Sequence, residues 1–191
     1  MVATKLSRAD YLSLDTGLEP PCEFVDGEII EMPPESSQNV LISLFILQQF
    51  LQLVPLPWVR RNDTELVVSG RVRVPDFMVL GEDLALALQG QPRSTITEEM
   101  PAPRLVVEVV SPGKVNEDRD YRYKRSEYAV RGIAEYWIVD PGQAKVTVLT
   151  LVDGWYEAEI LRENDVLRSP QFSALELVVS QLLNPSAQPE S

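Results

Sequence analysis

The sequence predicts an α/β fold, a single domain in which helices flank a central mixed β-sheet. Strand-like apolar runs alternate with helix-like segments along the chain, which is typical of this class. With 191 residues, 45% of them hydrophobic, the chain is long enough for one domain with a sizeable core. Residues 105–110 form an unbroken apolar run around Glu108 and are expected to be the central strand, buried on both faces. We expect the domain to span residues 7–183, with residues 184–191 as a short frayed tail.

The first part of the chain has clear start and turn signals. Ser7 is a suitable N-cap for a helix. Asp26 and Gly27 between two short β-rich runs are a strong hairpin signal, and Pro33 and Pro34 then break the chain. The expected elements are a helix over residues 8–15, strands over 23–25 and 28–32, and a long core helix over 38–54.

The remainder of the chain alternates between strands and helices. Gly132 is expected to stop a helix, and Asp153 with Gly154 to form a second hairpin turn. The expected strands cover residues 59–62, 65–68, 73–80, 105–110, 135–139, 145–151 and 155–161. The expected helices cover residues 82–89, 117–131 and 173–183, with a polar loop over 90–103.

Two acids stand at the ends of strand-like apolar runs, Asp76 after Pro75 and Glu108 in the central run. An unpaired charge taken out of water costs several kcal/mol, so acids in such positions need a partner. On neighbouring strands, the two would hold hard oxygen ligands close together, which suits Mg²⁺ or Mn²⁺ rather than zinc. The alternative is that each is an ordinary strand-end acid that caps a loop or pairs with an arginine.

A lysine-bearing helix follows Glu108. Asp120, Lys124 and Tyr128 recur at a spacing of four residues and lie, with Tyr121, along one face of this helix. Lys124 could therefore point at the sheet. The alternative is that it pairs with Asp120 on a solvated face.

These motifs, in this order, resemble a restriction endonuclease family that is abundant in cyanobacteria. The family is domain of unknown function family 820 (Uma-type), a branch of the PD-(D/E)XK nuclease superfamily. The resemblance covers nearly the whole chain, about residues 7–183. It is carried by Glu23-Phe24-Val25-Asp26-Gly27-Glu28, Pro75-Asp76, Glu108-Val109-Val110-Ser111-Pro112, the Asp120, Lys124 and Tyr128 spacing, and Gly132-Ile133-Ala134-Glu135-Tyr136-Trp137-Ile138-Val139-Asp140-Pro141.

The resemblance implies a restriction-endonuclease-like core and a set of site residues. Asp76 matches the first metal-binding acid of the superfamily, and Glu108 matches the acid of its Glu-x-Lys element. The lysine of that element should stand at position 110, where this chain has Val110. Lys124 on the following helix matches the family's displaced lysine, and its flexible stem would let it reach the same point in space.

Two further positions follow from the resemblance. Glu23 matches a family acid near the first hairpin and is a candidate outer-shell ligand, with a plain strand-end acid as the alternative. Many relatives have a histidine near the start of the second helix, where this chain has Asn39. A histidine base is therefore not expected there.

The residue types favour metal-assisted phosphodiester hydrolysis. Asp76, Glu108 and the main-chain carbonyl of Val109 would hold Mg²⁺ (or Mn²⁺), and Lys124 would orient the attacking water or stabilise the charge that develops on the phosphate. The expected activity is that of a metal-dependent endodeoxyribonuclease with DNA as its partner, acting as a homodimer because two related sites cut two strands most easily. Two alternatives stay open: a nuclease-fold protein that only binds a protein or nucleic acid, and a hydrolase of another phosphoester.

Composition excludes several other classes. The chain has no histidine, which excludes histidine-rich zinc sites, Ser/His/Asp triads and Cys/His nucleophiles. A single cysteine, Cys22, cannot form an intramolecular disulfide. The N-terminal residues lack the apolar core of a signal peptide, and the most apolar stretch, residues 40–54, is too short to cross a membrane. A cytoplasmic protein is therefore expected.

Net charge is the main argument against nucleic-acid binding. The chain has 17 Lys and Arg against 29 Asp and Glu, a formal charge of -12, and a uniformly acidic surface would repel phosphates. Local basic patches near the acids would have to offset this, unless they are ion-pair partners of nearby acids. The candidates are Arg60, Arg61, Arg71, Arg73, Arg119, Arg122, Lys124 and Arg125.

The large aromatic side chains are expected to pack in the core or on a sheet face rather than to stack on bases. They are Trp58, Tyr136, Trp137, Trp155 and Tyr156.

Overall fold

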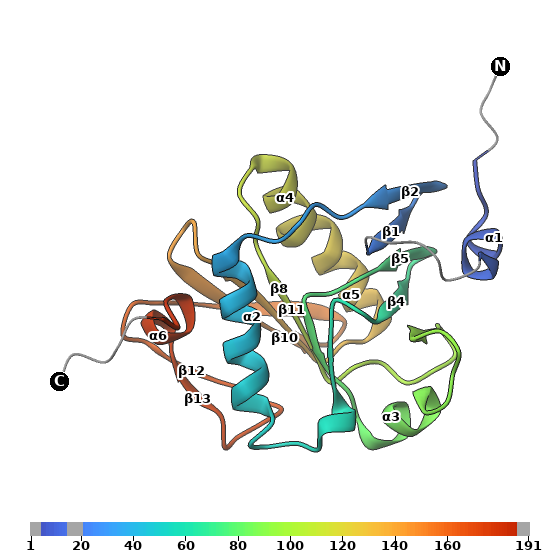
Figure 1. Ribbon diagram of the computed structural model, residues 1–191. Helices are drawn as coiled ribbons and strands as arrows, with labels where there is room; N and C mark the ends of the chain where they lie inside the picture. Colours follow the sequence, from blue (N-terminus) through green and yellow to red (C-terminus); the bar gives the residue numbers. More distant parts are fainter. Residues whose placement is uncertain (1–4, 15–20, 187–191) are drawn as a thin grey trace.

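A computed structural model describes residues 5–14 and 21–186 and contains the expected mixed α/β domain (Figure 1). The first helix, α1 (Arg8–Ser13), begins at the expected N-cap, because the Ser7 hydroxyl oxygen accepts a hydrogen bond from the Asp10 N–H at 3.1 Å. The last expected residue of this helix, Asp15, and the end of the expected tail lie outside the described residues. Within the described ranges, no helix is long and apolar enough to cross a membrane.

The larger sheet has six strands in the order β11-β10-β9-β8-β6-β3. Only the β8–β9 pair is parallel among these neighbours. The expected central strand, β8 (Leu105–Val109), lies inside this sheet and is buried throughout. The other five strands are β3 (Val59–Arg61), β6 (Phe77–Val79), β9 (Glu135–Asp140), β10 (Lys145–Val152) and β11 (Trp155–Arg162).

The smaller sheet has five strands in the order β2-β1-β5-β4-β7. The expected turn at Asp26 and Gly27 joins β1 to β2, with φ values of 53° and 92°. A similar turn at Ser69 and Gly70, which was not predicted from the sequence, joins β4 to β5. The strands are β1 (Cys22–Val25), β2 (Glu28–Glu31), β4 (Glu65–Val68), β5 (Arg71–Arg73) and β7 (Thr95–Ile96), the last of these inside the expected loop.

The single strand expected over residues 73–80 is wrong, because the chain changes sheets there. Strand β5 ends at Arg73 in the smaller sheet, and β6 begins at Phe77 in the larger one. Pro75 stands between them and has no N–H to donate to a ladder, so a continuous central strand cannot pass through it. The break leaves Asp76 directly before β6.

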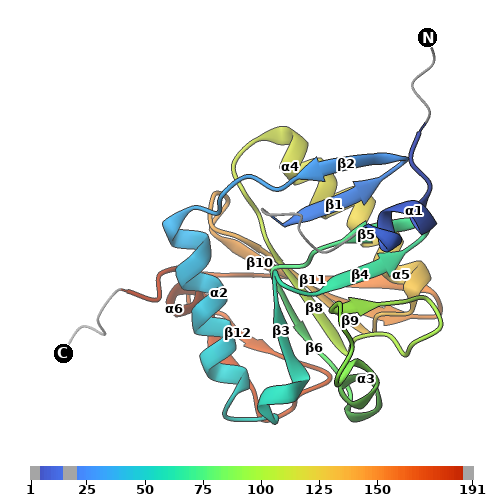
Figure 2. The ribbon, with the colours of Figure 1, turned by 45° about the vertical axis from the view of Figure 1, so that its right-hand side comes forward.

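Helices cover both faces of the larger sheet (Figure 2). Side chains alternate along β8: Leu105, Val107 and Val109 join one apolar cluster, and Val106 and Val110 join another. Helices α2 (Ser37–Phe50) and α6 (Val179–Leu183) contribute to the first cluster, and α3 (Glu82–Leu88) and α5 (Arg125–Arg131) to the second. Glu108 therefore faces the second layer.

The helix expected over residues 117–131 is longer and less regular than predicted. It consists of α4 (Lys114–Asp118), a π-helical segment η2 (Arg119–Lys124), and α5, which ends at Gly132 in the left-handed region with φ of 78°. The Tyr136 hydroxyl donates to the main-chain carbonyl of Asp120 at 3.0 Å, inside the π segment. A side chain inserted into the helical ladder is a common cause of such a segment.

Three other expectations need correction. Helix α2 ends at Phe50 rather than at residue 54, and Pro55 limits any continuation. The closing helix expected over 173–183 is mostly absent, because Glu176–Val178 forms strand β13 against β12 (Val166–Arg168), and only α6 remains. Trp155 is 80% exposed, whereas Tyr136 and Trp137 are fully buried and Tyr156 is buried, as expected.

Candidate active site

Asp76 lies directly before β6, and Glu108 lies on the adjacent strand β8. Strands β6 and β8 are antiparallel, with Phe77 opposite Val107, so Asp76 and Glu108 form the next opposed positions along the register. The Asp76 carboxylate accepts a hydrogen bond from the Val109 N–H at 2.6 Å. The strands beside the two acids, β6 and β8, are neighbours as expected, but Asp76 precedes β6 rather than lying in it.

The surroundings of the two carboxyl groups disfavour their ionised forms, mainly because both groups are removed from water. Burial raises the pKa of Asp76 well above its usual value, and the nearby charge of Glu108 raises it further. Burial also raises the pKa of Glu108, although the Lys124 ammonium opposes this shift. A bound cation would favour the ionised form of both groups.

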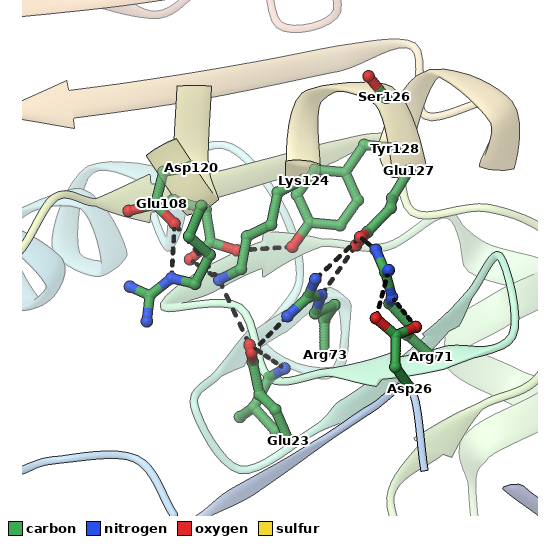
Figure 3. Close-up of polar contacts among 12 residues, drawn as sticks. Glu23, Asp26, Arg71, Arg73, Glu108, Asp120, Lys124, Ser126, Glu127 and Tyr128 are labelled. Atoms are coloured by element: carbon green, nitrogen blue, oxygen red, sulfur yellow. Dashed lines mark hydrogen bonds and ion pairs between the residues drawn. The ribbon is translucent and has the colours of Figure 1, made fainter. Parts of the chain in front are cut away.

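Lys124 lies beside Glu108, as expected from the sequence (Figure 3). Its buried ammonium is 2.8 Å from the Glu108 Oε2, 3.4 Å from the Glu23 Oε1 and 3.6 Å from the Asp120 Oδ1. Burial would lower the pKa of Lys124, but these three acids outweigh burial and raise it. The alternative of a solvated pair with Asp120 alone is therefore wrong, since both side chains are fully buried.

Tyr121 and Tyr128 of this helix have different partners. The Tyr128 hydroxyl donates to the Glu108 Oε1 at 2.6 Å, so both oxygens of Glu108 are held, one by Tyr128 and the other by Lys124. The Tyr121 hydroxyl instead donates to Asp140 on β9 at 2.9 Å. Val110, where the resemblance predicts a lysine, packs in the apolar cluster with Tyr128.

Glu23 lies behind Lys124 and belongs to a buried ion network. It accepts a hydrogen bond from Arg73 at 2.8 Å, besides its contact with Lys124. Burial alone would raise the pKa of Glu23, but the charges of Lys124 and Arg73 lower it to about 2. Glu23 does not line the pocket that contains Asp76 and Glu108, so an outer-shell role for it stays a prediction.

The network continues from Arg73 to the first hairpin. Arg73 donates twice to Glu127 on α5, each time at 2.8 Å. Arg71 also contacts Glu127 and pairs with Asp26 in the turn at 2.8 Å. Figure 3 shows this chain of charges running from Glu108 to the β1–β2 hairpin.

A pocket of about 320 Å³ opens over the two acids. One wall comes from the segment between β2 and α2, and the opposite wall from α4 and the start of η2. The lining residues are Pro21, Met32, Pro33, Pro34, Glu35, Asn39, Asn62, Val74, Asp76, Glu108, Val109, Ser111, Asn116 and Arg119.

The donors at the base of this pocket fit a hard divalent cation. Asp76, Glu108 and the Val109 carbonyl supply oxygen only. Asn39 also lines the pocket, and its side-chain amide donates to the Val109 carbonyl at 3.4 Å. Among the described residues, no group of three Asp, Glu, His or Cys side chains could hold a metal together. A cation here would therefore keep several waters, as Mg²⁺ commonly does.

Several pocket residues were missed from the sequence. Glu35 precedes α2, accepts from Asn62 at 3.0 Å, and adds to the raised pKa of Asp76. Arg119 was considered only as one member of a basic cluster. An acid directly after Pro33 and Pro34 was the available signal for Glu35, since those prolines fix the chain beside the helix start.

Most basic side chains of the proposed patches form ion pairs or hydrogen bonds within the protein. Arg71, Arg73, Arg119 and Lys124 pair with neighbouring acids. Arg60 donates to the main-chain carbonyls of Pro57 and Val59, and Arg125 to that of Tyr156. For these residues the ion-pair and structural alternative is correct, except that Arg119 uses only its Nε in the pair with Asp120.

The fold defines the class of protein, a single α/β domain in which helices flank a mixed sheet. The chain is similar to the crystal structure of a putative nuclease of domain of unknown function family 820 from Anabaena variabilis, with a TM-score of 0.69 and 19% identity. The match covers 93% of this chain and 97% of that one. The family model for Uma2, described as putative restriction endonuclease, matches residues 8–180. The chain therefore belongs to the Uma2 family. No curated protein matches it.

Proposed function

We propose that this protein is a metal-dependent endonuclease that hydrolyses phosphodiester bonds in DNA. The observation that carries the proposal is the pair Asp76 and Glu108 at the base of one pocket, with the Lys124 ammonium 2.8 Å from Glu108. Membership in a family described as restriction endonucleases supports a nuclease. The metal and the DNA substrate are inferred from the chemistry of the pocket.

Asp76, Glu108 and the Val109 carbonyl would hold Mg²⁺ or Mn²⁺. When bound, the ion would polarise the scissile phosphate and lower the pKa of a bound water. Asn39 would orient the Val109 carbonyl through its amide hydrogen bond of 3.4 Å. The Val109 N–H fixes the Asp76 carboxylate in the same way.

Lys124 would act through Glu108. The lysine does not line the pocket, so its place differs from the expected direct contact with the attacking water. Its charge offsets part of the raised pKa of Glu108 and so favours the ionised ligand. Tyr128 holds the other oxygen, which fixes the orientation of the carboxylate.

One observation favours the rival function, a binding protein with the nuclease fold. Lys124 is fully buried among three acids, and Val110 occupies the position of the usual lysine. A protein that lost catalysis could keep this network for stability alone.

Cleavage assays separate the two functions. Purified protein should nick plasmid DNA with Mg²⁺ or Mn²⁺ and stop when a chelator is added, because the ion supplies the Lewis acid. Asp76→Asn should abolish nicking, whereas Glu159→Gln, at an exposed position on β11, should not change it. No nicking of any DNA under all metals and salts would favour the rival. Equal nicking by wild type and Asp76→Asn would indicate a contaminant.

A further inference from the structure

The walls of the pocket differ in chemistry from its base. Near the two acids the surface is formed by apolar residues and side-chain amides. The apolar members are Pro21, Met32, Pro33, Pro34 and Val74, and the amides are Asn39, Asn62 and Asn116. Apolar walls with a few polar groups are typical of sites for small organic ligands, and 320 Å³ lies at the lower end of their volumes.

Charge in the pocket is unfavourable for a duplex. Glu35 adds a third acid to Asp76 and Glu108, and Arg119 is the only cation among the described lining residues. Duplex binding relies on many Lys and Arg contacts to phosphates. Here, most of the nearby basic side chains are engaged in ion pairs or main-chain hydrogen bonds.

Arg119 lines the pocket and has donor groups to spare. Its Nε donates to the Asp120 Oδ1 at 3.0 Å, which fixes the plane of the guanidinium. The two terminal nitrogens make no hydrogen bond within the described part of the chain, and the side chain is 22% exposed. A guanidinium held in this way presents a planar fork of donors to a phosphate.

We propose that the pocket binds one unpaired nucleotide of a DNA strand, with the Arg119 guanidinium on its phosphate and the apolar and amide walls around its nucleoside. This inference rests on the proposed function and specifies its substrate as single-stranded or locally unpaired DNA. A base can enter such a pocket only after leaving the stack, which is easiest where it has no partner. A single nucleotide brings one phosphate, which the one cation of the described pocket lining, Arg119, can bind.

The test is a binding measurement, so it does not depend on turnover. Fluorescence anisotropy would compare a short fluorescein-labelled single strand with a blunt duplex of the same sequence, in Ca²⁺. The single strand should bind about tenfold more tightly than the duplex, and Arg119→Ala should remove about tenfold of that affinity. Asn116→Trp, which fills the pocket from the α4 side, should cause a similar loss.

Two control variants test whether a loss of binding is specific to the Arg119 guanidinium. Arg122→Ala, in the same helical segment but 72% exposed, should leave binding unchanged. Arg119→Lys keeps a charge beside buried Asp120, so the fold is retained, but loses the planar fork and should still bind more weakly.

The outcomes separate this inference from the proposed function. A duplex bound as tightly as the single strand, no binding of either, or no effect of both pocket variants would overturn the inference. Nicking of intact duplex by the same preparation would then leave the nuclease proposal standing. Absence of cleavage on both DNA forms, with single-strand binding retained, would instead overturn the nuclease proposal alone.

Discussion

At the scale of single residues, the central feature is an acid that the fold holds in an unfavourable state. Asp76 has one main-chain donor, Val109, and faces the charge of Glu108. The ammonium of Lys124 only partly offsets this repulsion. Such a position is costly for the metal-free protein and is suited to binding a cation.

Asp76→Asn should therefore stabilise the metal-free protein at neutral pH. Because the folded pKa of Asp76 is raised, the folded state holds its proton longer than the unfolded chain. The free energy of unfolding should fall as pH rises from about 4 toward the folded pKa, by about 1.4 kcal/mol for each pH unit within that window. In Asp76→Asn, the contribution of Asp76 to the dependence of the free energy of unfolding on pH should be lost. The dependence that is left should come from Glu108, whose pKa is also raised.

Urea denaturation from pH 5 to pH 8 in a chelator measures both slopes. Glu159→Gln, at an exposed strand position, is the matched control and should follow wild type. If the free energy of unfolding of Asp76→Asn and wild type changes with pH in the same way, the pKa of Asp76 is not raised in the folded protein.

Lys124→Met tests whether the buried ammonium is required by its neighbours. Removing the cation leaves Glu23, Glu108 and Asp120 buried without it, which should cost about 3–5 kcal/mol. Adding Glu23→Gln to this variant should recover part of the loss, because one uncompensated charge disappears. Thermal and urea unfolding measure both effects, and a loss below about 1 kcal/mol would show that the ion cluster is not needed for folding.

The sequence identified some site residues better than others. Asp76, Glu108 and Lys124 were found because strand-end acids and a helix-face lysine follow simple spacing rules, and the family motifs agree. Glu35 and Arg119 could not be placed, because their approach to the pocket depends on how two distant segments pack together.

At the scale of elements, the break between β5 and β6 positions the site. The chain leaves the smaller sheet at Arg73 and enters the larger one at Phe77, so Arg73 joins the ion network while Asp76 joins the pocket. The sequence did not predict this change of sheet, because the residues on both sides of Pro75 form one continuous apolar pattern. Hairpin turns and the central strand were predictable because their signals are local, whereas β12, β13 and the π segment depend on tertiary contacts.

The network between β5 and α5 should be energetically coupled. Arg73 and Glu127 are both buried and share two hydrogen bonds of 2.8 Å. A double-mutant cycle with Arg73→Met and Glu127→Gln should give a coupling energy of about 1.5–3 kcal/mol. The exposed pair Arg168 and Glu176, 66% and 61% exposed, is the control and should give about 0–1 kcal/mol. Similar values for the two pairs would contradict the assigned role of the network.

At the scale of the whole molecule, one stretch of the chain carries no charged side chain. Residues 36–59 contain no charged side chain in a chain of formal charge -12. Within this stretch, five leucines are exposed: Leu41, Leu44, Leu51, Leu53 and Leu56. Two copies of this uncharged segment can pack together without the charge repulsion expected between acidic parts of the protein. We therefore predict a homodimer that forms through α2.

Light scattering after size exclusion should give the dimer mass for wild type. Leu44→Glu should shift the measured mass to that of the monomer, because each of the two copies then places a buried negative charge in the interface. Ile160→Glu, at an exposed position on β11, should leave the dimer mass unchanged. Monomeric wild type at micromolar concentration would contradict the prediction.

The claim that Asp76 and Glu108 form a divalent metal site is tested most directly by crystals soaked in Mn²⁺, with diffraction recorded at the manganese absorption edge. We expect one anomalous peak in the pocket, about 2.0–2.3 Å from oxygens of Asp76, Glu108 and the Val109 carbonyl, which is absent from Asp76→Asn crystals. A pocket without a peak, or a peak that Asp76→Asn leaves unchanged, would contradict it.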